Sequence, residues 1–119
     1  MSDGLTRGSF RDIPADEPYS GVVRRAFDSA GATMTRYEFE PGARFPQHHH
    51  PQEQILIVEE GVVQFTVAGV PQRLVPGDWA VVGPDVEHGL QAGETGARFL
   101  AIVVPRRAAA DAYTVSGAR

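Results

Sequence analysis

The 119-residue sequence predicts a single all-β domain, and three observations support this prediction. Thirteen Gly and nine Pro residues interrupt the chain at short intervals. The runs between them are short and rich in Val, Ile, Thr, Phe and Tyr, which is typical of many strands joined by turns. A chain of this length is also expected to form one domain around one hydrophobic core.

Strands are expected near residues 33–40, 54–60, 62–68, 72–75, 79–83, 88–91 and 97–104. Because side chains alternate between the two faces of a strand, every second residue of the first run shares a face. That face carries Thr33, Thr35, Tyr37 and Phe39. The other face carries Met34, Arg36, Glu38 and Glu40. Alternation leaves open which face is interior: Arg36 and Glu38 are either a pair inside the barrel or solvated charges outside it.

Residues 55–58 and 99–104 differ from this pattern because both of their faces are apolar. A strand of this kind needs cover on both sides. In a closed barrel the interior covers one face, so a second sheet layer or another subunit must cover the other. We therefore expect a homodimer.

The two ends of the chain are expected to lie outside the barrel. Residues 1–20 are predicted to form an N-terminal arm, residues 21–105 the barrel, and residues 106–119 a C-terminal segment. Three consecutive alanines at 108–110 favour a short helix within residues 106–112, followed by a tail.

The composition excludes several classes of function. Arg supplies all 11 positive charges against 15 acidic residues, and the net charge of −4 does not favour a nucleic-acid or anionic-membrane partner. The absence of Cys excludes a thiolate nucleophile, and the absence of Lys excludes Schiff-base chemistry. No apolar stretch approaches the roughly 20 residues of a membrane span, and residues 1–11 lack the apolar centre of a secretory signal. We expect a cytoplasmic protein with a small-molecule partner.

Four histidines carry the strongest chemical signal: His48, His49, His50 and His88. The first three lie in a stretch that is expected to be extended, so His48 and His50 share one face and His49 lies on the other. Gln54 follows His50 by four residues and can share the same face. With His88 as a third nitrogen donor, this arrangement predicts a site for one divalent transition metal.

The spacing around these residues resembles the two motifs of the cupin superfamily. Gly42 precedes His48 by a gap of five residues, Gln54 follows His50 by a gap of three, and Gly61 follows Gln54 by a gap of six. A second block runs from Gly77 through Gly83 and Asp85 to His88. The resemblance implies a double-stranded β-helix, the cupin jelly-roll barrel. It also implies one metal ion per chain, Zn, Mn, Ni or Fe, with four ligands: His48, His50, Gln54 and His88.

Gln54 stands where the cupin motif usually has Glu, and this departure bears on the chemistry. Glu53 is an alternative fourth ligand if a bulge turns it toward the metal. A glutamine ligand is neutral, so three imidazoles and Gln54 leave the ion at its full positive charge as a strong Lewis acid. This favours a reaction without net redox change.

The run from His48 to Gln54, His-His-His-Pro-Gln-Glu-Gln, is similar to that of small cupins of pectin and alginate degradation, which linearise unsaturated uronates. That resemblance implies a substrate-binding role for Arg107. The acidic acid/base residue of those proteins has no direct counterpart here, and Glu94 is the candidate substitute. The expected function is a metal-dependent isomerase, ring-opening enzyme or lyase acting on a small sugar-acid-like substrate. The alternatives are a metal-dependent dioxygenase of the quercetinase-like type and a non-enzymatic small-molecule-binding protein.

Overall fold

The computed structural model describes residues 4–109 and 112–116, and within these residues it contains strands and one 3₁₀ turn but no α-helix. The turn is η1 (Phe10–Asp12). The strands, in chain order, are β1 (Asp16–Tyr19), β2 (Val22–Asp28), β3 (Thr33–Phe39), β4 (Arg44–His49), β5 (Glu53–Val67), β6 (Val70–Leu74), β7 (Trp79–Val82), β8 (His88–Val104) and β9 (Thr114–Val115). The prediction of an all-β fold is confirmed.

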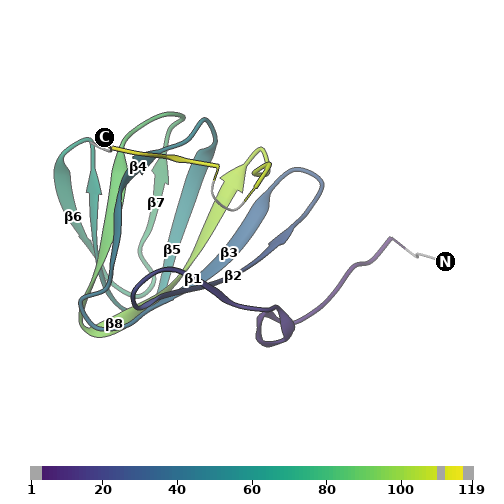
Figure 1. Cartoon of the computed structure of the whole chain (residues 1–119), viewed down its shortest axis with the longest axis horizontal. Helices are drawn as coiled ribbons and strands as arrows, with labels where there is room; N and C mark the ends of the chain where they lie inside the picture. The colour runs from purple at the N-terminus through teal and green to yellow at the C-terminus, as the bar shows by residue number, and fades with distance from the viewer. Residues whose placement is uncertain (1–3, 110–111, 117–119) are drawn as a thin grey trace.

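Two long strands, β5 and β8, organise the barrel, because each takes part in both of its walls (Figure 1). The first half of β5 pairs with the last residues of β8, and this pair is flanked by β7 on one side and β3 on the other. With β2 and β1 beside β3, one wall has the strand order β1-β2-β3-β8-β5-β7. The remaining halves of β5 and β8 pair again, with β4, β6 and β9 beside them, and form the second wall. This curled arrangement of antiparallel strands is the jelly-roll barrel that the sequence implied.

The bends in β5 and β8 meet at two glycines. Gly61 and Gly96 both have positive φ, at 72° and 78°, and the pairing register shifts between Val58 and Glu60 and again between Gly61 and Val63. The sequence predicted separate strands on either side of Gly61. Instead, a bulge carries one continuous strand around the corner, since a bulge bends a strand without ending it.

The barrel interior is filled by one face of each strand. The structure decides which face of β3 is interior, because Thr33, Thr35, Tyr37 and Phe39 are all buried, whereas Arg36 and Glu38 lie on the other face. Phe99 lies at the centre of an aromatic cluster, with ring centroids 5.2 Å from Tyr37 and 5.0 Å from Phe39. These side chains fill one end of the interior and leave the polar side chains described below at the other.

A row of apolar residues crosses the outer face of the first wall. The strand register aligns one residue from each of five neighbouring strands in a row across it: Val81, Ile55, Ile102, Met34 and Phe27. Trp79 and Val81 on β7 are 69% and 52% exposed. The two-faced apolar runs of the sequence therefore have their inner faces covered by the barrel and their outer faces on the surface of this chain.

The chain ends differ from the sequence-based expectation. Strand β1 lies within the predicted N-terminal arm and pairs with β2, a strand that was not expected either. Residues 106–109 form no helix, and residues 110–111 of the expected helix lie outside the described residues. Strand β9 lies within the predicted C-terminal segment, and its two residues pair with His48 and His49 of β4. Both differences bring terminal segments to the polar end of the barrel.

Candidate metal centre

Three histidines meet inside the barrel where β4 ends and β8 begins. His48 and His88 are cross-strand neighbours in the β4–β8 pair, and His50 follows directly after β4. All three are buried, and one nitrogen from each lies within 4.8 Å of the others. This group can hold a metal ion. His49 points the other way, with 40% of its side chain exposed and its Nδ1 atom 3.8 Å from the Asp85 carboxylate.

Backbone carbonyls determine which ring nitrogen of each histidine carries the proton. The Nδ1 atom of His48 lies 2.8 Å from the Pro46 oxygen, that of His50 lies 3.0 Å from the Gln52 oxygen, and that of His88 lies 2.8 Å from the Val86 oxygen. A carbonyl oxygen only accepts, so Nδ1 is the donor in each ring. The three Nε2 atoms therefore carry lone pairs. Carbonyl-oriented imidazoles of this kind are typical of metal ligands.

Gln54 points its amide oxygen into the same space from the start of β5. Its Oε1 atom lies 3.0 Å from His50 Nε2 and 3.3 Å from His88 Nε2. With Nδ1 protonated in both rings, this contact brings three lone-pair atoms together, an arrangement that a cation satisfies. Glu53 is exposed on the opposite face, because the β5 bulge lies farther along the strand. The structure therefore brings Gln54, and not Glu53, to the histidines.

The environment keeps the imidazoles neutral. Burial and, after it, the neighbouring His88 lower the pKa of His48 to about 3. Burial likewise lowers the pKa of His88 to about 4 and lowers that of His50. Because a metal binds the neutral imidazole, these shifts keep the donors available well below neutral pH.

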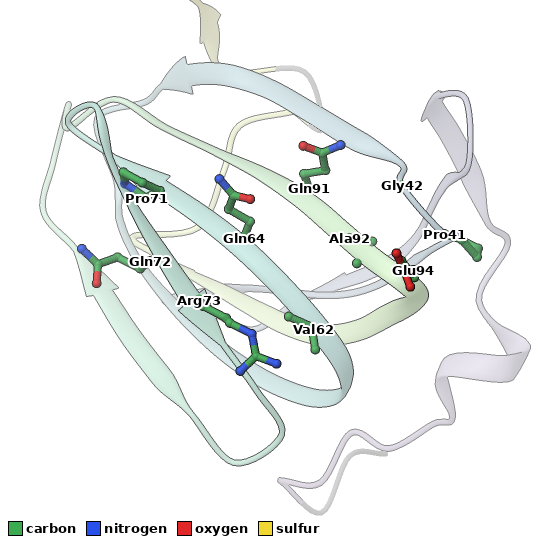
Figure 2. A pocket seen from close by; sticks show the side chains of 11 residues that line it. Pro41, Gly42, Val62, Gln64, Pro71, Gln72, Arg73, Gln91, Ala92 and Glu94 are labelled. Atoms are coloured by element: carbon green, nitrogen blue, oxygen red, sulfur yellow. The ribbon is translucent and has the colours of Figure 1, made fainter.

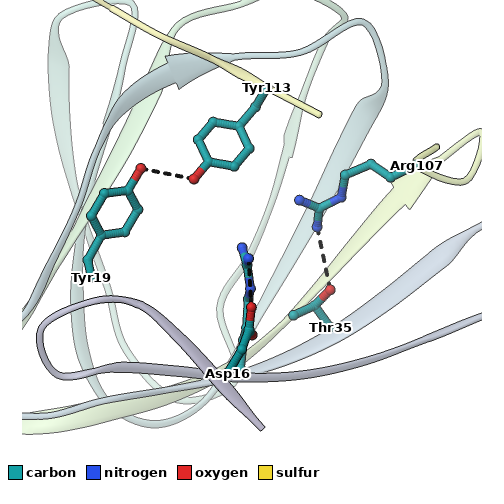
Figure 3. Close-up of polar contacts among 6 residues, drawn as sticks. Asp16, Tyr19, Thr35, Arg107 and Tyr113 are labelled. Atoms are coloured by element: carbon teal, nitrogen blue, oxygen red, sulfur yellow. Dashed lines mark hydrogen bonds and ion pairs between the residues drawn. The ribbon is translucent and has the colours of Figure 1, made fainter. Parts of the chain in front are cut away.

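Aromatic rings form the walls around the histidines. Ring centroids of Phe45 and Tyr113 lie 4.6 Å and 5.1 Å from that of His48, and Phe65 lies 5.9 Å from His88. The Tyr113 and Tyr19 hydroxyl oxygens are 2.9 Å apart, so β1 and the segment before β9 close one side of the site (Figure 3). Sequence reasoning missed Tyr19 and Tyr113, because neither belongs to a motif and both reach the site only through strand pairing at the chain ends.

Arg107, which the sequence assigned to substrate binding, lies beside the histidines. Its backbone N–H donates to Thr33 Oγ1 at 2.8 Å, and its guanidinium lies 3.5 Å from Thr35 Oγ1 (Figure 3). After burial, the positive charge of Arg107 is a further cause of the lowered pKa values of His48 and His50. The segment that follows β8 is thus anchored to β3 with its guanidinium toward the metal centre.

Glu94, the second residue that the sequence assigned to catalysis, lies apart from the histidines. It is exposed at the bend of β8, six residues after His88, which is roughly 20 Å along an extended strand. It lines a groove of about 760 Å³ together with Gln64, Arg73 and Gln91, as Figure 2 shows. No histidine lines this groove, so the structure does not bring Glu94 to the metal centre.

The described part of the chain contains no helix with the length and hydropathy of a membrane span. Comparison with curated proteins finds no match to this chain.

Several solved structures share this fold. An RmlC-like cupin from Shewanella frigidimarina matches with a TM-score of 0.77 and 26% identity over 90% of this chain and 95% of its own. KdgF from Halomonas sp. matches with a TM-score of 0.76 and 26% identity over 86% of this chain and 97% of its own. The polyketide cyclase RemF from Streptomyces resistomycificus shares the fold at a TM-score of 0.80, with 20% identity over 97% of this chain and 87% of its own.

A family model of the cupin domain matches residues 35–103, which is more than half of the chain and includes all four residues that converge at the candidate metal centre. The chain belongs to the cupin domain family.

Proposed function

We propose that the protein is a metal-dependent enzyme without net redox chemistry, of the isomerase, ring-opening or lyase type, acting on a small sugar-acid-like substrate. One observation carries the proposal: three buried imidazoles and a neutral amide oxygen converge, and among the described residues no carboxylate joins them. Four neutral donors leave a divalent ion with its full charge, which suits it to polarise a substrate oxygen.

In this proposal His48, His50, His88 and Gln54 hold one divalent transition metal, which supplies Lewis-acid activation of a bound oxygen when present. The protein's own contribution is to orient these donors through the backbone carbonyls and to surround them with Phe45, Phe65 and other apolar groups. Apolar walls limit access of water, so charges inside the site interact strongly.

Arg107 is proposed to position the substrate by binding an anionic group next to the metal. Its position between β3 and the histidines supports this role, and so do the motif resemblance to the uronate-linearising cupins and the similarity to KdgF. Glu94 is left out of the proposed machinery because it is exposed at the bend of β8, away from the histidines. The proposed assembly is a homodimer with one metal per chain.

The test combines metal analysis with turnover. Freshly purified protein is expected to carry about one divalent transition metal per chain, and His88→Ala is expected to lose it because a nitrogen donor is removed. His49→Ala is the matched control, since His49 is adjacent to two of the ligands but faces Asp85. Unsaturated and cyclic sugar acids are then followed by NMR, with oxygen consumption measured in parallel.

Conversion of a sugar acid without oxygen uptake would support the proposal. Iron or nickel with oxygen uptake would identify a dioxygenase instead, and tight binding without conversion would identify a binding protein. Equal metal content in the two histidine variants would refute the ligand assignment itself.

A further inference from the structure

A second, smaller cavity lies on the inner side of β2 and β3, beside the segment that follows β8. Its volume is about 160 Å³. Its polar lining comes from Arg24, Thr33, Thr35 and Arg107, with Asp28 at its exposed rim. Since a water molecule occupies roughly 30 Å³ in the liquid, the cavity holds a group of about five heavy atoms.

Arg24 is the least expected residue of this lining, because an arginine is rarely so deeply buried. Only 8% of its side chain is exposed. Its Nε and Nη2 atoms donate to the two oxygens of Asp16, a residue of β1, at 2.9 and 3.0 Å. Its Nη1 atom is buried without a hydrogen-bond partner within the described residues. A buried donor of a charged group without an acceptor is costly, so this edge is suited to an incoming acceptor.

The charge of Arg24 is secured by its neighbours. Burial by itself would lower the pKa of Arg24, but the hydrogen bond to Asp16 and the interactions with the Tyr37 phenol raise it above its usual value. Asp16 binds two nitrogens of the Arg24 guanidinium. This bidentate contact fixes the orientation of the guanidinium, and with it the direction of Nη1. The other carboxylate near the cavity, Asp28, is engaged by the Thr33 hydroxyl at 2.6 Å.

The cavity lies next to the metal centre. Arg107 belongs to its lining, and the same guanidinium acts electrostatically on His48 and His50. Thr35 on β3 is 1% exposed, and its Oγ1 atom lies 3.5 Å from the guanidinium of Arg107. Two guanidinium groups and a hydroxyl thus line the cavity, and one of these guanidinium groups also acts on the histidines.

We propose that Arg24 binds a carboxylate in this cavity, with its Nη1 edge as a donor and with Thr35 and Arg107 beside it. The inference rests on the proposed function and specifies its substrate: an organic acid whose carboxylate is held away from the metal while another oxygen of the molecule reaches it. A planar carboxylate accepts two hydrogen bonds side by side, which matches the geometry of guanidinium donors. The size of the cavity admits a carboxylate with one or two further atoms.

The experiment uses acetate as the probe and acetamide as its neutral counterpart of the same shape. Thermal unfolding of wild type, Arg24→Gln and Arg25→Gln is measured with about 50 mM of either compound at matched ionic strength, in zinc-loaded and in EDTA-treated protein. Arg25 is the matched control, since it is the next residue on β2 but faces outward and pairs with Glu38 at 3.5 Å. Acetate is expected to raise the unfolding midpoint of wild type and Arg25→Gln by roughly 3 °C, with or without zinc. It should not do so in Arg24→Gln, and acetamide should have no effect.

Each contrary result is decisive. An acetate shift that is absent in wild type, or equal in Arg24→Gln and wild type, overturns the carboxylate subsite. A shift that appears only with zinc and survives in Arg24→Gln means that acetate binds the metal directly, which also overturns it. Failure of zinc to stabilise wild type would refute the metal centre and leave the acetate result intact.

If Arg24→Gln does not fold, Arg24→Lys replaces it. A lysine keeps the charge, but it cannot bind both Asp16 oxygens and a carboxylate at the same time. The Arg24→Lys variant should therefore lose at least half of the shift in unfolding midpoint that acetate causes.

Discussion

At the scale of single residues, the metal centre depends on short-range contacts between each imidazole and its own backbone. Each carbonyl acceptor lies two residues from its histidine, so the extended chain itself places Pro46, Gln52 and Val86 oxygens at the Nδ1 atoms. Ring orientation and tautomer are therefore determined locally, while the convergence of the three Nε2 atoms requires β4, β5 and β8 to meet. Gln54 completes the set through its amide oxygen.

The identity of the fourth ligand can be tested with two neighbouring variants. Gln54→Glu nearly preserves the shape of the side chain and adds a negative charge, so we expect tighter binding of a divalent metal and slower non-redox turnover, because the ion becomes a weaker Lewis acid. Glu53→Gln is the matched control and should leave metal content unchanged, since Glu53 is exposed on the opposite face. Metal analysis of both variants measures this. A third variant, Gln54→Ala, covers the contrary case. If Glu53→Gln loses the metal and Gln54→Ala retains it, Glu53 and not Gln54 is the fourth ligand.

The lowered pKa values predict how the metal-free protein responds to acid. The pKa values of His48 and His88, about 3 and about 4, lie below the usual 6.5, so between pH 6.5 and about 4 the unfolded chain binds protons that the folded chain does not. The free energy of unfolding should therefore fall as the pH is lowered through this window, by up to about 1.4 kcal/mol per pH unit for each histidine.

Urea unfolding in EDTA across this pH range measures the effect. The double variant His48→Gln, His88→Gln should lose most of the slope, whereas His49→Gln, which changes a partly exposed histidine, should keep it. A slope that depends on His49 and not on the buried pair would contradict the prediction.

At the scale of elements, the bends of β5 and β8 allow two strands to serve both walls of the barrel. The two bends are in direct contact: a Cβ atom on Gly61 would lie 2.0 Å from the Gly96 carbonyl oxygen and 2.9 Å from the Ala97 Cα atom. Backbone atoms cannot move aside without breaking the ladder that joins β5 to β8. Gly61 is therefore required both for its positive φ and for the close approach of the two strands.

Gly61→Ala should lower the free energy of unfolding by about 3 kcal/mol or more, through overpacking and backbone strain together. Gly69→Ala provides the matched control, because Gly69 also has positive φ, at 80°, but has nothing within 4 Å of its Cβ position. That variant should cost only the backbone part, about 1 kcal/mol. Urea unfolding of both variants measures these two losses. Equal losses of unfolding free energy would show that the close contact with Gly96 does not contribute to the effect.

At the scale of the whole molecule, the first wall has one face in the barrel and a row of apolar side chains across the other. The row Val81, Ile55, Ile102, Met34 and Phe27 crosses five strands, and Trp79 lies beside it. Phe10 covers part of this face at one edge, with its ring 5.6 Å from that of Phe27. Trp79, Val81 and Phe27 remain exposed, and a contiguous row of exposed apolar side chains is typical of a subunit interface.

We predict that this face joins two copies of the chain. Sedimentation equilibrium should give twice the 12.8 kDa chain mass, and Trp79→Glu should shift the protein toward monomer, because it introduces a charge into the interface. Val70→Glu is the control, since Val70 is 55% exposed but lies on β6 in the other wall. A wild-type protein that sediments at 12.8 kDa at micromolar concentration, or equal behaviour of both variants, would refute the interface.

Local patterns in the sequence determine the all-β class, the alternation along β3 and the histidines of the metal centre. Alternation along a strand depends only on neighbouring residues, so the order of the residues alone places Thr35 and Tyr37 on one face. That this face is the buried one is decided by the closure of the barrel. The same parity argument separates His49 from its neighbours and Gln54 from Glu53. The spacing from His48 to His88 indicated the family before any contact was known.

Only the tertiary structure decides which distant segments share the barrel interior. A glycine with positive φ fits a turn or a bulge equally well, so the continuity of β5 through Gly61 depends on its contact with Gly96 in β8. Strand pairing at the chain ends brings Tyr113 to His48 and Asp16 to Arg24, and the length of β8 carries Glu94 away from the histidines. These contacts join residues far apart in the sequence, and such pairings leave no local periodicity, because they arise from the closure of the two walls around one interior.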